Sequence, residues 1–297
     1  MMTSQTGGRP LVVGVDGSSG ADLAVRWAAR HAAEIGAPLR LVHAVAAAET
    51  VTALLPIPVG VSSVGLRRPG PTASQVLESA TAEAARHLPQ PRVTAEPVSA
   101  DPERALLDAS AEAALLVLGS GGHHRVTSTL FGSVALRVIA DAGCPTVVVR
   151  GESPPDAPVV VAVDNSESCE PALRFAFREA ARRRRTLVAV HAWQPPLPRT
   201  GAGMMTVAPA WENLAESAGI ALATALAPLR AAFPDVTVRE RLLGGHPEVA
   251  VPDDTTGAAL IVAGSRGRGP VAGLILGSTS QALIHRSSCP VAVVRDS

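Results

Sequence analysis

The sequence predicts an α/β protein built from two tandem domains, each a doubly wound parallel sheet with helices on both faces. Three observations predict this fold. The chain has 297 residues, about twice the common size of a single domain. Short, continuous apolar runs alternate with segments of helical periodicity. Blocks of sequence from the first half also return, in the same order, in the second half.

The internal repeat defines the two domains. Four blocks return in order: residues 11–16 as 159–164, 39–44 as 186–192, 115–120 as 260–265, and 143–150 as 288–295. A proline-rich stretch separates the copies and has the composition of a stiff, extended linker. We therefore place the domains at residues 1–151 and 157–297.

The first copy alternates strands and helices along its length. Residues 11–15 form an apolar run typical of a strand buried on both faces, and 20–35 carries apolar residues at helical spacing. Further strands are expected at 39–45, 93–98, 115–118 and 146–149, with helices at 73–87, 102–114 and 133–140. This order predicts a five-stranded parallel sheet with right-handed crossovers. Such sheets bind ligands beyond the carboxyl ends of their strands.

The second copy contains one irregular element. Its third helix is expected near residues 247–258, where Pro252 and the polar run that follows it break helical continuity. We expect a shortened or irregular helix there.

Composition excludes several classes of function. The 26 basic residues are all arginine and balance 26 acidic ones, which argues against a nucleic-acid partner. Without lysine, the chain has neither a Walker A loop nor a Schiff-base amine. Three widely spaced cysteines make no disulfide framework or zinc knuckle. With no signal sequence and no apolar run of membrane-spanning length, we expect a soluble, cytoplasmic protein.

A glycine pattern follows the fourth strand in each copy. The spacing G-x2-G-x9-G-S occurs at Gly119, Gly122, Gly132 and Ser133, and again at Gly264, Gly267, Gly277 and Ser278. Glycines let backbone N–H groups approach an anion, and a helix start adds its dipole. Glycines that only punctuate turns are the alternative for a single copy. Two copies with identical spacing favour a phosphate-binding loop, although neither copy has the G-x-G-x-x-G of a dinucleotide-binding fold.

Asp16 and Asp164 end the first strand of each copy, at the same sheet edge as the glycine loops. A carboxylate there could accept a hydrogen bond from a ribose hydroxyl or hold a metal that rides on phosphates. It could equally be a turn or helix-capping residue. Position alone leaves these readings open.

These residues and spacings resemble the tandem-domain universal stress proteins of the ATP-binding type, and the resemblance covers nearly the whole chain as two successive domains. It implies a sheet order of 3-2-1-4-5 in each domain and ATP, with Mg²⁺, in each cleft. Adenine would meet the backbone after the second strand, and no metal-ligating residue is assigned. The resemblance assigns the nucleotide to Asp16, Ala44, Gly119, Gly122, Gly132, Ser133, Val134, Asp164, Ala192, Gly264, Arg266, Gly267, Gly277, Ser278 and Thr279.

The two copies differ within the loop. The second carries Arg266 and Arg268 where the first carries paired His123 and His124, so we expect the second site to bind ATP more tightly. The histidine pair could bind a metal, but adjacent residues rarely face one ion. The long, small-residue segments 46–71 and 194–209 flank the expected adenine end and are typical of lids or contact surfaces.

Other reactive side chains have plainer interpretations. We expect Cys144 and Cys289 to be small buried residues, and His43 and His191 to be packed at strand ends. Cys169 stands early in a helix, where its pKa could be lowered, although nothing nearby suggests a base. The arginine run 182–185 ends a helix and is expected to be a solvated cap rather than a binding patch.

Three functions remain open from the sequence. The leading one is an ATP-binding regulator of stress response or growth, which an unidentified protein partner recognises. The second is a slow ATPase or nucleotidyl transferase, for which no motif places a general base. The third is a scaffold with degenerate pockets. We also expect the two domains to pair within the chain, and a homodimer is plausible.

Overall fold

The computed structural model describes residues 8–45, 71–89, 92–120, 133–154, 156–194, 208–266 and 276–295. These residues divide into two compact units, one up to Cys144 and the other from Pro145 onward. Both are α/β, with sheets that are mostly parallel, as predicted. Among the described helices, none is long and apolar enough to cross a membrane.

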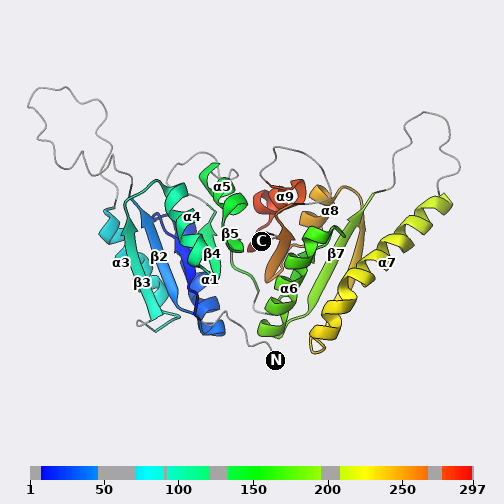
Figure 1. Cartoon of the computed structure of the whole chain (residues 1–297), viewed down its shortest axis with the longest axis horizontal. Helices are drawn as coiled ribbons and strands as arrows, with labels where there is room; N and C mark the ends of the chain where they lie inside the picture. The colour runs from blue at the N-terminus through cyan, green and yellow to red at the C-terminus, as the bar shows by residue number, and fades with distance from the viewer. Residues whose placement is uncertain are drawn as a thin grey trace, which may run out of the picture. The chain divides into compact units, whose positions relative to one another are not determined.

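The first unit is a parallel sheet in the order β3-β2-β1-β4. Helices α1 and α3 contact each other, and so do α4 and α5 (Figure 1). The strands are β1 (Leu11–Gly14), β2 (Leu39–Ala44), β3 (Val93–Val98) and β4 (Leu115–Gly119), and the helices are α1 (Ser19–Ile35), α3 (Ala73–Ala85), α4 (Pro102–Glu112) and α5 (Ser133–Asp141). These bounds agree with the sequence-based ranges to within a few residues.

Local chemistry explains where the helices of the first unit begin. Ser18 Oγ accepts from Ala21 N at 3.2 Å and caps α1, which ends at Gly36 in the left-handed region (φ 72°). A capping box starts α3, and Asp101 caps α4 ahead of a proline in its first turn. The central strands are almost fully buried and consist of valine, leucine and glycine.

The second unit contains a sheet in the order β5-β10-β9-β6-β7-β8. The strands of the second repeat therefore follow the order 3-2-1-4-5, with β8 as the third and β10 as the fifth. The strands are β5 (Thr146–Val149), β6 (Val159–Ala162), β7 (Leu187–Trp193), β8 (Val238–Gly244), β9 (Leu260–Gly264) and β10 (Val291–Val294), and the helices are η3 (Glu167–Cys169), α6 (Glu170–Arg183), α7 (Ala208–Ala232), α8 (Pro247–Asp254) and α9 (Ser278–Arg286). Figure 1 shows α6 and α7 over one face of this sheet.

Strand β5 comes from the end of the first repeat, yet it belongs to the second compact unit. It runs antiparallel to β10, with Val148 opposite Val291. Just beyond it, Arg150 Nη1 donates to the carbonyl oxygens of Ile284 and His285, both at 2.7 Å, at the end of α9. Arg150 thus satisfies carbonyls that the helix leaves without an intrahelical partner.

Helix α8 is shortened, as predicted, to residues Pro247–Asp254. The predicted break at Pro252 is wrong, because the helix continues through this proline for two more residues. Pro252 has no N–H to donate to the carbonyl of Glu248, four residues earlier. Arg286 Nη1 donates to that carbonyl instead, at 3.2 Å, and Arg286 Nη2 pairs with Asp253 at 2.7 Å. A side chain from α9 therefore replaces the missing hydrogen bond.

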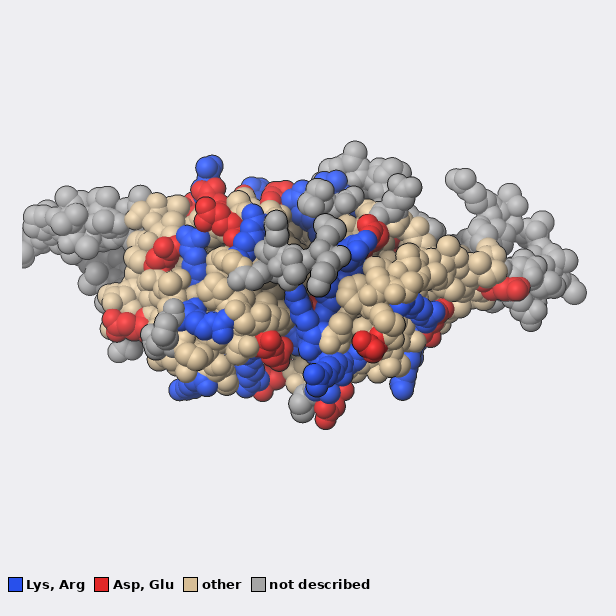
Figure 2. Space-filling model, turned by 60° about the horizontal axis from the view of Figure 1, so that its bottom comes forward, with Lys and Arg blue, Asp and Glu red and all other residues tan. Residues whose placement is uncertain are grey.

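The arginine run at the end of α6 is largely ion-paired. Buried Glu179 contacts Arg182 at 3.3 Å and Arg183 at 3.1 Å, and Arg185 contacts Asp156 at 2.8 Å. Arg184 ends the helix in the left-handed region (φ 51°). Figure 2 shows acidic and basic side chains interspersed over the face that it presents. These pairs support a helix cap rather than a binding patch.

Candidate functional site

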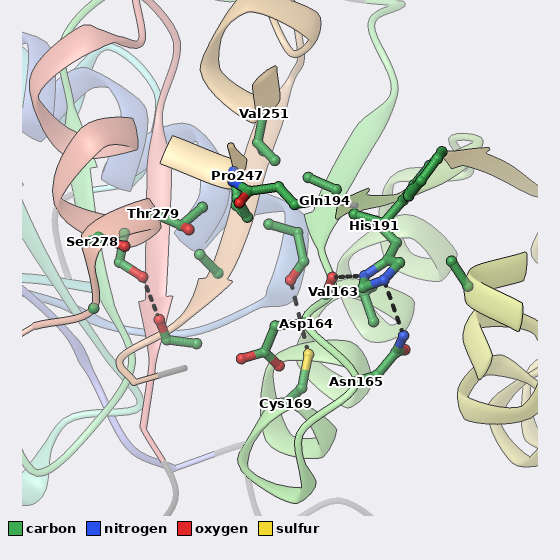
Figure 3. A pocket seen from close by; sticks show the side chains of 18 of the residues that line it. Val163, Asp164, Asn165, Cys169, His191, Gln194, Pro247, Val251, Ser278 and Thr279 are labelled. Carbon is green, nitrogen blue, oxygen red and sulfur yellow. Dashed lines mark hydrogen bonds between the residues drawn. The ribbon is translucent and has the colours of Figure 1, made fainter. Parts of the chain in front are cut away.

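A cavity of about 870 Å³ opens at the carboxyl ends of β6, β7 and β9 in the second unit (Figure 3). This is the sheet edge at which the topology predicts a ligand. Its walls come from these strand ends and from the starts of α8 and α9, with apolar side chains of α7 closing one side. Seven of the sequence-predicted residues line it: Asp164, Ala192, Gly264, Arg266, Gly277, Ser278 and Thr279. Gly267 lies outside the described residues.

Asp164 follows β6, and its two carboxylate oxygens have different surroundings. Oδ1 accepts from Ser166 N at 3.0 Å and from Ser166 Oγ at 2.6 Å. The Ser166 and Ser168 hydroxyls lie 2.9 Å apart. Oδ2 is buried and has no hydrogen-bond partner among the described residues. Ser166 therefore occupies Oδ1, whereas Oδ2 is enclosed by the protein without a partner among the described residues.

The start of α9 forms the opposite wall. Gly277 is its N-cap residue, and no side chain caps the helix. The loop is held in place because Gly277 N donates to Ser265 O at 2.9 Å and Ser280 Oγ donates to Gly264 O at 2.5 Å. Ser278 and Thr279 of the first turn line the cavity, and the free N–H groups at the start of a helix favour an anion.

His191 and Asn165 form a hydrogen-bonded pair in the cavity wall that the sequence did not predict. His191, 6% exposed, places Nδ1 2.7 Å from Val163 O, so this nitrogen carries a proton. Nε2 then accepts from Asn165 Nδ2 at 3.3 Å. Asn165 lies in the left-handed region (φ 56°) directly after Asp164. An asparagine after a strand-ending aspartate is the sequence signal that could have indicated it.

The cysteines are not activated. Burial raises the pKa of Cys169 to about 11 and that of Cys144 to about 12, and it also raises the pKa of Cys289. Cys169 lines the cavity, and its Sγ lies 3.8 Å from Ala162 O. The alternative of a lowered pKa at Cys169 is therefore wrong, because desolvation outweighs the effect of the helix start. Cys144 and Cys289 are buried, as expected.

In the first unit, Asp16, Ala44 and Gly119 lie at the carboxyl ends of three adjacent strands. Asp16 Oδ1 accepts from Ser18 N at 2.9 Å. A Cβ on Gly119 would lie 2.3 Å from the backbone of Gly20, so close packing alone requires this glycine.

The structure describes only some of the other residues that the sequence predicts for the first site. Ser133 and Val134 begin α5, and the side chain of Val134 is 36% exposed. Gly122, Gly132, the pair His123–His124 and most of both predicted lid segments lie outside the described residues. So does Arg268 of the second loop.

Among the described residues, no group of three or more histidine, cysteine or acidic side chains could hold an ion. Arg266 lines the cavity beside the start of α9. The described walls thus combine the uncapped start of α9 with an arginine and the carboxylate of Asp164.

Comparison with known proteins gives a consistent result. The model of the family described as the universal stress protein family matches residues 8–150 and 157–295. A universal stress protein of Mycobacterium tuberculosis (strain H37Rv) is 34% identical over 304 residues, covering 100% of this chain and 99% of that protein. A second one from the same strain is 35% identical over 295 residues, covering 97% of each.

Solved structures agree in fold. A universal stress protein of Archaeoglobus fulgidus has a TM-score of 0.60 at 20% identity, covering 98% of this chain and 99% of that chain. A putative universal stress protein of Pseudomonas aeruginosa has a TM-score of 0.64 at 15% identity, covering 98% and 93%.

Proposed function

The chain belongs to the universal stress protein family, and on that premise we propose that its second unit binds ATP and that the protein acts as a nucleotide-dependent regulator of stress response or growth. One observation carries the proposal: seven residues predicted for a nucleotide line a single cavity. Its volume, about 870 Å³, is within the range of small-molecule sites.

The cavity suits the phosphate end and the base end of a nucleotide. Phosphates would lie at the uncapped start of α9, next to Arg266, where N–H groups and the helix dipole favour negative charge. The base would lie at the end of β7, beside Ala192 and the apolar wall of α7. Mg²⁺ would be held mainly by the phosphates and water, as is usual for this ion.

The hydrogen bonds and the burial of the reactive side chains in the cavity wall favour regulation over catalysis. His191 has both ring nitrogens in hydrogen bonds, and the thiol of Cys169 is buried with a raised pKa. Neither is prepared to act as a base or a nucleophile toward a bound nucleotide. We accordingly keep a slow ATPase as the second candidate and expect turnover far below the ~10 s⁻¹ of ordinary enzymes.

The binding part of the proposal is tested by calorimetry on the full chain. The protein is stripped of nucleotide by unfolding and refolding, the released material is identified, and ATP with Mg²⁺ is titrated back. Arg266→Gln should weaken binding at the second unit by roughly tenfold, because a charge-assisted contact to phosphate is lost. Arg174→Gln, on the exposed face of α6, is the matched control and should leave binding unchanged.

Two outcomes would overturn the proposal. Failure of the folded wild-type chain to bind any adenine nucleotide would favour a scaffold with degenerate pockets. Rapid release of phosphate from ATP would favour an enzyme. The regulatory part is tested in cells that carry Arg266→Gln: loss of the stress or growth phenotype supports it, whereas a wild-type phenotype with lost binding contradicts it.

A further inference from the structure

Helix α9 connects the proposed phosphate end of the cavity to a residue of the first sequence repeat. Its first turn, with Ser278 and Thr279, lines the cavity. The helix has nine residues, so its other end is about 13 Å away along the axis. A helix this short has few hydrogen bonds of its own and depends on tertiary contacts to stay in place. The contacts at the far end of α9 therefore bear on the geometry of the cavity.

Arg150 holds the far end of α9. An α-helix leaves its last four carbonyl groups without an intrahelical donor. Ser287 N donates to the first of them, Leu283 O, at 3.0 Å. Arg150 Nη1 donates to the next two, those of Ile284 and His285, both at 2.7 Å. Burial lowers the pKa of the Arg150 guanidinium, which stays charged. A partly desolvated cation therefore stands at the negative end of the helix dipole.

Backbone packing keeps Arg150 in this position. The residue follows β5, which pairs with β10, and the next residue in the chain is Gly151. A Cβ on Gly151 would lie 2.4 Å from Ser288 O, just after α9. That distance is too short for any side chain, so the segment that carries Arg150 approaches the end of α9 as closely as a backbone can.

Helix α8 is tied to the same end of α9. Figure 1 shows the two helices side by side. Arg286, the last residue of α9, donates to Glu248 O of α8 at 3.2 Å. Two other residues of α8, Pro247 and Val251, line the cavity together with the first turn of α9 (Figure 3). Two walls of the cavity are therefore joined at the end of α9 that Arg150 holds.

We propose that Arg150 is a positioning residue for the phosphate end of the second-unit cavity. By holding the end of α9, it keeps the first turn of that helix in the place where it meets an anion. This inference rests on the proposed function, because it requires phosphates at the start of α9. A cation at the C-terminal end and an anion at the N-terminal end both interact favourably with the same helix dipole. The first sequence repeat thus supplies a residue on which the site of the second repeat depends.

The experiment measures dissociation constants of the full chain, stripped of nucleotide, for ATP and for adenosine by calorimetry. Adenosine has no phosphate, so the ratio of the two affinities reports on the phosphate end. Arg150→Gln should weaken ATP binding roughly threefold to tenfold, within the range for substitutions that act through a packed network, and should leave adenosine binding unchanged. Arg150→Lys, which keeps the charge, should restore most of the loss. A parallel titration of Arg266→Gln identifies the second-unit site in the binding curve.

Two further variants separate the position of Arg150 from its charge. Gly151→Ala keeps Arg150 but places a methyl group against Ser288 O, so it should also lower the ratio of ATP to adenosine affinity. Arg230→Gln is the matched control. This arginine also donates to a backbone carbonyl of the second unit, that of Val238 at 3.5 Å, but it is not among the residues that line the cavity. Its replacement should leave the ratio unchanged.

The possible failures are distinguishable. An unchanged ratio in Arg150→Gln, with ATP still bound by the wild-type chain, overturns the positioning role and leaves ATP binding intact. An equal loss of affinity for ATP and adenosine also overturns it, because Arg150 would then hold the fold as a whole rather than the phosphate end. No binding of ATP by the folded wild-type chain overturns the proposed function itself.

Discussion

The two units carry a matching aspartate and serine after their first strand, and the serine hydroxyl makes different hydrogen bonds in each. In the first, Ser18 caps α1, whereas in the second the matching Ser166 donates to Asp164 and α6 begins without a side-chain cap. Gly17 and Asn165 share a left-handed backbone (φ 76° and 56°), but only the asparagine reaches a histidine. The same local backbone conformation is thus accompanied by a helix cap in the first copy and by a hydrogen bond to the aspartate in the second.

The largest expected effect compares the two strand-ending glycines. A methyl group on Gly119 would lie 2.3 Å from the backbone of Gly20, whereas one on Gly264 would lie 3.2 Å from Arg266 O. We expect Gly119→Ala to lower the free energy of unfolding by about 3 kcal/mol, because packed backbone must move. Gly264→Ala should cost less than about 1 kcal/mol. Urea denaturation measures both, and equal costs would show that the two loops are packed alike.

The next effect compares the third helices, α4 and α8. Arg286→Ala should destabilise the second unit by about 1.5 kcal/mol, because the carbonyl of Glu248 loses its donor and the exposed Asp253 loses its partner. In a double-mutant cycle with Pro252→Ala, which restores a backbone N–H, the penalty should become smaller. Arg104→Ala removes an exposed pair within α4 and should leave the free energy of unfolding almost unchanged. If the effects of the two single substitutions simply add in the double variant, Arg286 does not replace the hydrogen bond that Pro252 cannot donate.

A smaller effect separates the two serines. Ser18→Ala should lower the free energy of unfolding by about 1 kcal/mol, because α1 loses its N-terminal cap. Ser166→Ala should change stability less than this, since α6 has no side-chain cap to lose. Thermal unfolding of both variants gives the difference. A larger loss for Ser166→Ala would mean that its bonds to Asp164 hold the fold as well as the site.

The smallest effect concerns the left-handed residues. Asn165→Gly removes backbone strain together with the bond to His191, so the net change in stability should lie within about 0.5 kcal/mol. Gly17→Asn in the first unit should also be mild, because asparagine tolerates this conformation better than other side chains. Chemical denaturation tests both. A loss above about 2 kcal/mol for Asn165→Gly would make the Asn165–His191 pair a structural requirement.

The sequence predicts well what depends on local pattern. Apolar runs such as 11–15 and 146–149 locate buried strands, and the repeat identifies matching positions in the two copies. Sequence-based prediction fails where a residue far along the chain supplies the deciding contact. Pro252 stays in its helix because Arg286, 34 residues later (286 − 252), supplies a donor. The Ser166 hydroxyl serves Asp164 rather than a helix end, which no spacing reveals.

Because β5 belongs to the second unit, the boundary between the sequence repeats differs from the boundary between the compact units. The repeat ends after Arg150, but the compact units divide at Pro145. A fragment cut at the linker would leave the edge of β10 open to other chains, and would remove the arginine that holds the end of α9. A fragment that contains the whole second unit must therefore begin before β5. A fragment cut at the boundary of the sequence repeat would divide a sheet.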